Sequence, residues 1–138
     1  MRLNKMTGRV IATMGIAAMM MTQTAGVMAA EQTESKQLKV VYYNQADYPG
    51  KKIGGSTIQA AGCGPTAVAV CYSSLTGKKA DVPKMCKQAY KHGWYYTGQG
   101  CSHSVVPGLS KLYGMQCKGL GMDKDAVEKA LRAGHPVV

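Results

Sequence analysis

The stretch that decides the fold reads Gly62-Cys63-Gly64-Pro65-Thr66, a cysteine between two glycines directly before an apolar segment. Apolar residues then recur at helical spacing, at Val68, Cys71, Tyr72 and Leu75, and a glycine follows at position 77. This spacing predicts a helix with one buried stripe, and the glycine suits a left-handed helix end. Pro65 fits the first helical turn, where a missing N–H costs nothing. We therefore expect Cys63 at or just before the helix N-terminus.

Cys63 has the sequence environment of a nucleophile. At a helix N-terminus the helix dipole and the unpaired N–H groups favour a thiolate over a thiol. Gly62 and Gly64 permit a tight bend, and we expect them to leave space for a substrate beside the sulfur. The alternative is a buried structural cysteine beside a flexible turn, since cysteine is among the most buried residue types. The two flanking glycines favour the nucleophile.

The first 29 residues have the pattern of a secretory signal peptide. Three basic residues and no acidic one precede an apolar run at 10–21, and Val27-Met28-Ala29 resembles a cleavage site. The run is shorter than the roughly 20 residues of a membrane span, although an uncleaved anchor is the alternative. Cleavage after Ala29 predicts a flexible leader at 30–37 and a domain at 38–138. We expect a secreted or extracellular protein that leaves the membrane after signal cleavage.

The mature chain is basic but lacks the pattern of a nucleic-acid-binding protein. Removing residues 1–29 lowers the formal net charge from +10 to +7, because that segment holds three basic residues and no acid. The lysines are scattered singly or in pairs, such as Lys51-Lys52 and Lys78-Lys79, without a stripe of interleaved aromatic residues. A solvated basic surface that associates with anionic cell-wall polymer explains this better than a nucleic-acid partner.

All five cysteines lie in the predicted mature chain, at positions 63, 71, 86, 101 and 117. None forms a Cys-x-x-Cys pair, so we expect no metal site and no cofactor. An odd number leaves at least one thiol outside internal disulfides, and Cys63 is the natural one. The other four allow three pairings, and buried free thiols explain Cys71 and Cys86 equally well.

The remaining pattern predicts an α+β domain. We expect strands at 38–43, 115–120 and 136–138, which together would form a sheet, and a loop at 50–62. A second helix begins at Asp81 and ends at Gly93, with Met85, Cys86, Ala89 and Tyr90 on its inner side.

Two more helices and one aromatic loop complete the prediction. Ser102 or Ser104 caps a third helix that ends at Gly114. Asp123 caps a fourth helix that ends at Gly134, with inward residues at Val127, Ala130 and Leu131. The loop at 93–100 carries three aromatic residues that we consider for substrate binding, Trp94, Tyr95 and Tyr96.

The chain ends three residues into the last predicted strand. An unpaired apolar strand edge is a liability, so a domain rarely stops there. The sequence alone therefore suggests a chain cut short at its C-terminus; a three-residue final strand is the alternative.

Several motifs occur in an order that resembles a known family. They are Tyr43-Asn44-Gln45, the stretch at 62–66, Leu75-Thr76-Gly77-Lys78, Gly98-Gln99-Gly100 and Ala133-Gly134-His135-Pro136-Val137-Val138. Together they resemble the peptidase family thirty-nine-like papain-type cysteine peptidases, which are secreted bacterial hydrolases. The resemblance covers about 40–138. It implies a papain-like α+β fold that is incomplete at the C-terminus, with Cys63 as the nucleophile and Gln45 in the oxyanion hole.

The resemblance also implies a catalytic histidine in a glycine–histidine segment downstream of the strand that Pro136 begins, and the sequence does not include that segment. His92 stands at a helix end, His103 in a loop and His135 in a turn before a proline, so none matches the family position. We therefore expect a thiol peptidase acting on peptide or protein substrates, with the 138 residues inactive by themselves. The alternatives are a non-catalytic exported domain that binds peptide or cell-wall material, and a cell-wall amidase.

Overall fold

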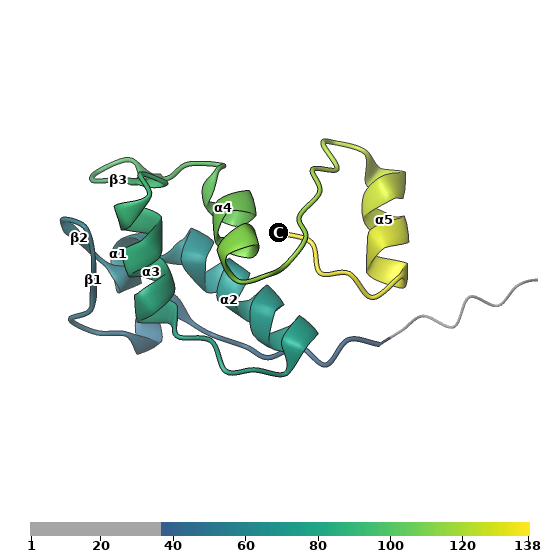
Figure 1. Cartoon of the computed structure of the whole chain (residues 1–138), viewed down its shortest axis with the longest axis horizontal. Helices are drawn as coiled ribbons and strands as arrows, with labels where there is room; N and C mark the ends of the chain where they lie inside the picture. The colour runs from purple at the N-terminus through teal and green to yellow at the C-terminus, as the bar shows by residue number, and fades with distance from the viewer. Residues whose placement is uncertain (1–36) are drawn as a thin grey trace, which may run out of the picture. The chain divides into compact units, whose positions relative to one another are not determined.

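The structure is a computed structural model that describes residues 37–138, so the predicted signal peptide and all but the last residue of the leader lie outside it. Helices dominate, with short antiparallel hairpins beside them, which confirms the α+β class (Figure 1). The elements in chain order are η1 (Gln45–Asp47), β1 (Lys52–Ile53), β2 (Ser56–Thr57), α1 (Ile58–Ala61), α2 (Cys63–Thr76), α3 (Val82–Lys91), β3 (Tyr95–Tyr96), β4 (Gly100–Cys101), α4 (Val105–Leu112) and α5 (Lys124–Arg132).

Helix α2 begins at Cys63, as the sequence predicts, and ends at Gly77, which has a φ of 69°. Its buried face differs from the predicted stripe. Leu75 is 45% exposed, whereas the small residues Ala69 and Ser73 are buried. Small side chains let α3 and α4 pack closely against this face, so packing rather than hydrophobicity selects it.

Helices α3 and α4 supply much of the core that holds α2. Met85, Cys86 and Ala89 of α3 are fully buried, as predicted, but Tyr90 is exposed. Helix α3 starts as expected, because the Asp81 carboxylate accepts a hydrogen bond from the Lys84 N–H at 2.9 Å. In Figure 1, α2, α3 and α4 lie together with the two hairpins at one end.

The three predicted strands are wrong. Residues 37–44, 115–120 and 135–138 form no strand, and the sheet expected from them is absent from the described part of the chain. The two hairpins that do form pair Lys52 with Thr57 and Tyr95 with Cys101. The first predicted strand runs against α2 instead, and the N–H of Val41 donates to the Ser74 hydroxyl at 2.9 Å. A β-branched segment becomes a strand only where a second strand pairs with it.

The loop predicted at 50–62 is also partly wrong, because it contains β1, β2 and α1. Helix α1 starts at a Thr57 cap, whose hydroxyl accepts a hydrogen bond from the Ala60 N–H at 3.2 Å. The chain then bends at Gly62 into α2. This short helix therefore leads directly to Cys63.

Helices α4 and α5 form close to their predicted positions. The Asp123 carboxylate caps α5 by accepting from the Ala126 N–H at 3.0 Å. Ser104 occupies the cap position of α4 but makes no side-chain cap bond. The predicted inward face of α5 is only partly confirmed: Val127 and Ala130 are half-buried, but Leu131 is 54% exposed and no residue of α5 is fully buried. Within residues 37–138, no helix is long and apolar enough to cross a membrane.

Candidate active site

Cys63 is exposed at the first position of α2. The first N–H groups of a helix have no partner inside that helix. The N–H of Cys63 would ordinarily reach the carbonyl of Gln59, four residues earlier, but this bond is absent from the part of the chain described here. Cys63 is therefore an exposed residue whose N–H is not bonded to that carbonyl.

Gln45 explains why that carbonyl is occupied. Its side-chain Nε2 donates a hydrogen bond to the Gln59 carbonyl oxygen at 2.7 Å. An amide nitrogen carries two hydrogens, so one remains for another acceptor. The Gln45 amide is therefore held against α1, the helix that precedes Cys63 in the chain, and its role in an oxyanion hole stays a prediction.

Gly62 and Gly64 do not provide the space for substrate that we expected. A Cβ at Gly62 would lie 2.6 Å from the Ile58 carbonyl oxygen. A Cβ at Gly64 would lie 2.9 Å from Cγ1 of Val105. The glycines are needed because the chain's own atoms fill the positions that their side chains would take.

Thr66, in the first turn of α2, stabilises the same turn at Gly62. It is 6% exposed, and its hydroxyl donates to the Gly62 carbonyl oxygen at 2.7 Å. The Thr66 N–H donates to the same oxygen at 3.0 Å. The carbonyl that precedes Cys63 is therefore held by two donors, which fixes the direction in which the chain enters α2.

A second thiol lies against this turn. The Sγ of Cys101 is 3.9 Å from the Ala61 carbonyl oxygen and would be 3.4 Å from a Cβ at Gly64. Burial raises the pKa of Cys101, and the neighbouring Cys63 adds to the effect. Behind it, burial raises the pKa of Cys86 to about 12. All five cysteines are free in the structure, so it shows none of the three pairings.

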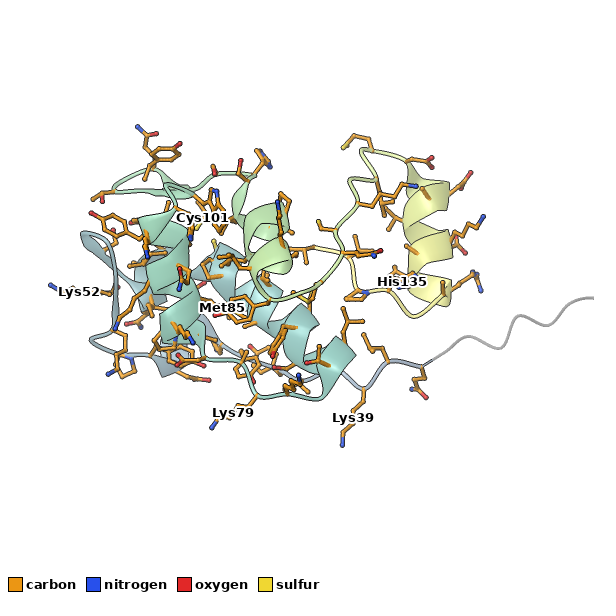
Figure 2. The ribbon with its side chains drawn as sticks, in the orientation of Figure 1. Lys39, Lys52, Lys79, Met85, Cys101 and His135 are labelled. Carbon is orange, nitrogen blue, oxygen red and sulfur yellow. The ribbon has the colours of Figure 1, made fainter. Side chains whose placement is uncertain are left out.

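The three histidines lie at different places in the described structure. No hydrogen bond in the described residues joins Cys63 to His92, His103 or His135. His92 stacks on Trp94, with ring centroids 4.8 Å apart. Figure 2 shows His135 beside α5, well separated from Cys101 and hence from the turn that Cys101 touches.

The three aromatic residues considered for substrate binding differ in exposure. Tyr95 is 3% exposed and belongs to the core. Trp94 is half-buried, and its ring fills the space beside Gly108. Tyr96 is 54% exposed, so it is the ring of the three that is most open to a ligand.

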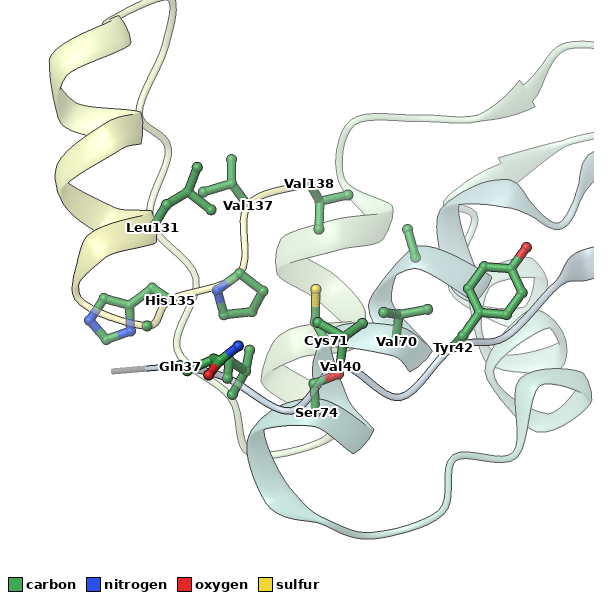
Figure 3. Close-up of a pocket in the computed structure, with 14 residues that line it drawn as sticks. Gln37, Val40, Tyr42, Val70, Cys71, Ser74, Leu131, His135, Val137 and Val138 are labelled. Carbon is green, nitrogen blue, oxygen red and sulfur yellow. The ribbon is translucent and has the colours of Figure 1, made fainter. Parts of the chain in front are cut away.

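A large apolar pocket lies elsewhere, between the N-terminal segment, α2 and the residues after α5 (Figure 3). It measures about 890 Å³, and its lining includes Val40, Cys71, Leu131 and His135 but not Cys63. The pocket is therefore separate from the candidate nucleophile.

The family model of the peptidase C39-like family matches residues 37–138. The chain belongs to this family. The family has a papain-like fold, which agrees with a cysteine at the start of a packed helix, and it indicates a cysteine peptidase type of hydrolase. Searches of curated proteins and of solved structures returned no significant match. Within the described residues, no cluster of His, Cys, Asp or Glu side chains could hold a metal ion.

The roles of Cys63 and Gln45 stay predictions, and no sequence pattern indicated the thiol that lies against the turn at Cys63. Cys101 is 38 residues away along the chain and reaches Gly64 through the packing of β4 and α4 on α2. No local spacing signals such a contact. The small residue at 64 was the available clue, because a glycine inside a helix often marks a close approach.

Proposed function

We propose that the protein is an exported thiol peptidase that hydrolyses peptide bonds through an acyl-enzyme at Cys63. The observation that carries the proposal is the 2.7 Å bond from Gln45 Nε2 to the Gln59 carbonyl oxygen. The bond holds the Gln45 amide against α1, which ends two residues before Cys63, and the amide keeps one N–H for another acceptor. Acyl transfer needs an accessible sulfur and hydrogen-bond donors for the developing oxyanion, and the Cys63 N–H and the Gln45 amide are the donors that we propose.

The chemistry follows from these positions. The Cys63 thiolate attacks the carbonyl carbon of the scissile peptide bond. The Cys63 N–H and the Gln45 amide stabilise the oxyanion, each donor lowering the barrier by about 3–4 kcal/mol. The amine leaves with a proton, and water then hydrolyses the thioester to regenerate the thiol.

The proposed reaction also needs a group that takes up and returns a proton. A positioned base contributes about 10²–10⁴-fold to such a reaction. Because none of the three histidines is hydrogen-bonded to Cys63, we propose that residues 1–138 by themselves do not turn over peptides. This part of the proposal concerns the 138 residues alone.

An activated ester tests the nucleophile without the base, because a nitrophenolate leaves without being protonated. The reduced protein is mixed with a peptidyl nitrophenyl ester, and the acyl group is located by mass spectrometry. We expect acylation at Cys63 in the wild type and none there in Cys63→Ala. Gln45→Ala should slow acylation by about 10²-fold. Gln59→Ala keeps the carbonyl that Gln45 contacts, so it is the matched control and should retain the wild-type rate.

A peptide library tests the need for a base. We expect no Cys63-dependent turnover. Turnover that disappears in Cys63→Ala would show that a histidine of this chain acts as the base. The variants His92→Ala, His103→Ala and His135→Ala would then identify that histidine. A wild-type protein that is not acylated by the ester would overturn the peptidase proposal.

A non-catalytic binding domain is the second candidate. It is supported by the absence, in the described residues, of a hydrogen bond between Cys63 and any histidine, and by Tyr96, which is 54% exposed. In that case Tyr96→Ala weakens retention on purified cell wall or on immobilised peptide, whereas Cys63→Ala does not. A cell-wall amidase would instead release Cys63-dependent products from purified peptidoglycan.

A further inference from the structure

We propose that Cys63 and Cys101 form a reversible disulfide that closes the candidate active site, with a low-molecular-weight disulfide such as oxidised glutathione as the oxidant. The inference rests on the proposed role of Cys63 as the nucleophile. It adds a modification site and a resolving thiol, Cys101, to that role.

Contacts on both sides of Cys63 place Cys101 beside it. Before Cys63 in the chain, the Ala61 carbonyl oxygen lies 3.9 Å from the Cys101 Sγ. After it, a Cβ at Gly64 would be 3.3 Å from the Cys101 Cβ and 3.4 Å from the Sγ. Disulfide-bonded cysteines need their Cβ atoms within about 3.5–4.5 Å of each other. A thiol that lies against Ala61 and Gly64, on either side of Cys63, is the one best placed to meet this requirement.

Cys63 and Cys101 differ in exposure, which suits a disulfide exchange in two steps. Cys63 is exposed, so a dissolved oxidant meets it first. Cys101 is half-buried, and burial raises its pKa, which keeps it protonated until the first step has occurred. The attacked and the resolving cysteine are thereby distinguished by exposure.

The other three cysteines are worse partners for Cys63. Cys86 is 0% exposed, and burial raises its pKa to about 12, so it forms little thiolate near neutral pH. Cys71 lines the apolar pocket, which Cys63 does not reach. Cys117 lies in the coil at 115–120, and its neighbour is Cys71, whose pKa is raised first by burial and then by Cys117.

The reaction proceeds in two exchanges. The Cys63 thiolate attacks one sulfur of oxidised glutathione, forming a mixed disulfide and releasing one glutathione thiolate, which takes up a proton. Cys101 then loses its proton and attacks the Cys63 sulfur, which forms the Cys63–Cys101 bond and releases the second glutathione. Two protein thiols are oxidised and one glutathione disulfide is reduced to two thiols.

In the disulfide, the Cys63 sulfur can no longer be acylated by a peptide. It is also protected from irreversible oxidation to the sulfinic acid. A reducing thiol restores it. The modification would therefore hold the exported protein inactive until it meets reducing conditions.

The test uses the full chain, purified reduced and then incubated with oxidised glutathione. After removal of the glutathione, free thiols are alkylated with iodoacetamide, and cross-linked peptides are sequenced by tandem mass spectrometry. We expect a Cys63–Cys101 cross-link and the loss of Cys63 alkylation, both reversed by dithiothreitol. In Cys101→Ser, Cys63 should instead remain as the glutathione mixed disulfide. Cys86→Ala is the matched control and should retain the cross-link.

Three outcomes overturn the proposal: a Cys101–Cys86 cross-link with Cys63 free, a lasting Cys63 mixed disulfide in the wild type, or equal labelling of Cys63 before and after oxidation. Because the mapping is done on the wild type, a Cys101→Ser variant that fails to fold does not affect it. Ester acylation of the reduced protein tests the proposed function separately. A cross-link without acylation would refute the peptidase, whereas acylation without a cross-link would refute the disulfide alone.

Discussion

The thiols of this chain differ mainly in how much water reaches them. Cys63 is exposed at a helix start, Cys101 is half-buried beside it, and Cys86 is enclosed between helices. Removing a thiolate from water costs free energy, so the buried sulfur keeps its proton to a higher pH. The burial of each cysteine therefore sets how readily its thiol reacts.

The raised pKa of Cys86 predicts a stability effect at high pH. An unfolded cysteine loses its proton near pH 8.5. The folded protein keeps the Cys86 proton to about pH 12, because burial raises that pKa. Between these pH values the folded state binds more protons than the unfolded state. The contribution of the Cys86 proton to the free energy of unfolding is therefore fully present below pH 8.5 and is lost as the pH rises towards 12.

The measurement is the free energy of unfolding by urea, for the wild type and for Cys86→Ala, at several pH values from 7 to 10.5. The values above pH 8.5 lie in the range where the Cys86 proton is held only by the folded protein. The variant should be less stable at pH 7, because it loses a buried sulfur. The difference between the two proteins should narrow as the pH rises. Parallel curves would contradict the predicted titration of Cys86.

At the scale of elements, the junction of α2 with α4 depends on the absence of a side chain at Gly64. A methyl group there would press on Val105 at 2.9 Å. We expect Gly64→Ala to destabilise the protein by about 1–3 kcal/mol through overpacking. Val105→Ala should relieve part of this, so that the double variant is less destabilised than the sum of the two single variants.

Gly119→Ala is the control for Gly64→Ala, because a Cβ at Gly119 meets nothing within 4 Å. Its effect on the free energy of unfolding by urea should stay within about 0.5 kcal/mol. A Gly64→Ala variant as stable as Gly119→Ala would show that α4 moves away from α2 without cost.

The two aspartate caps predict unequal effects. Asp81 caps α3, whose inner face is fully buried, whereas Asp123 caps α5, which has no buried residue. We expect Asp81→Ala to lower the free energy of global unfolding by about 1 kcal/mol. Asp123→Ala should change it by less and should act mainly on the local opening of α5. Urea unfolding gives the first quantity, and hydrogen exchange of the α5 amides gives the second.

For the molecule as a whole, the core is confined to one part of the described chain. Every buried hydrophobic residue lies between Ile53 and Leu109. The chain after Tyr113 adds no buried side chain, although Tyr113 itself packs edge-on against Tyr72, with ring centroids 5.3 Å apart. The segment at 114–138 therefore has less to hold it than α2, α3 and α4 have.

Native-state hydrogen exchange should resolve this difference. Amides in the middle of α2 and α3 should exchange only through global unfolding, whereas those of α5 should exchange through local opening at much lower free energy. Limited proteolysis should accordingly cut first between 114 and 138. Protection of α5 equal to that of α2 would mean that α5 unfolds together with the core.

The local features of this chain were predictable from the sequence. The start of α2 at Cys63, its end at Gly77 and the caps at Asp81 and Asp123 all agree with prediction. These features depend on hydrogen bonds and backbone angles among residues within about four positions of one another, so a short stretch of sequence contains all the groups involved.

Only the tertiary structure decided what surrounds Cys63. The predicted strands failed because strand formation needs a partner from elsewhere in the chain. The role of Gly64, the burial of Tyr95 and the approach of Cys101 all depend on how β4 and α4 pack on α2. Such contacts join residues about 40 positions apart, and their geometry follows from the close packing of the whole core, which no local pattern encodes.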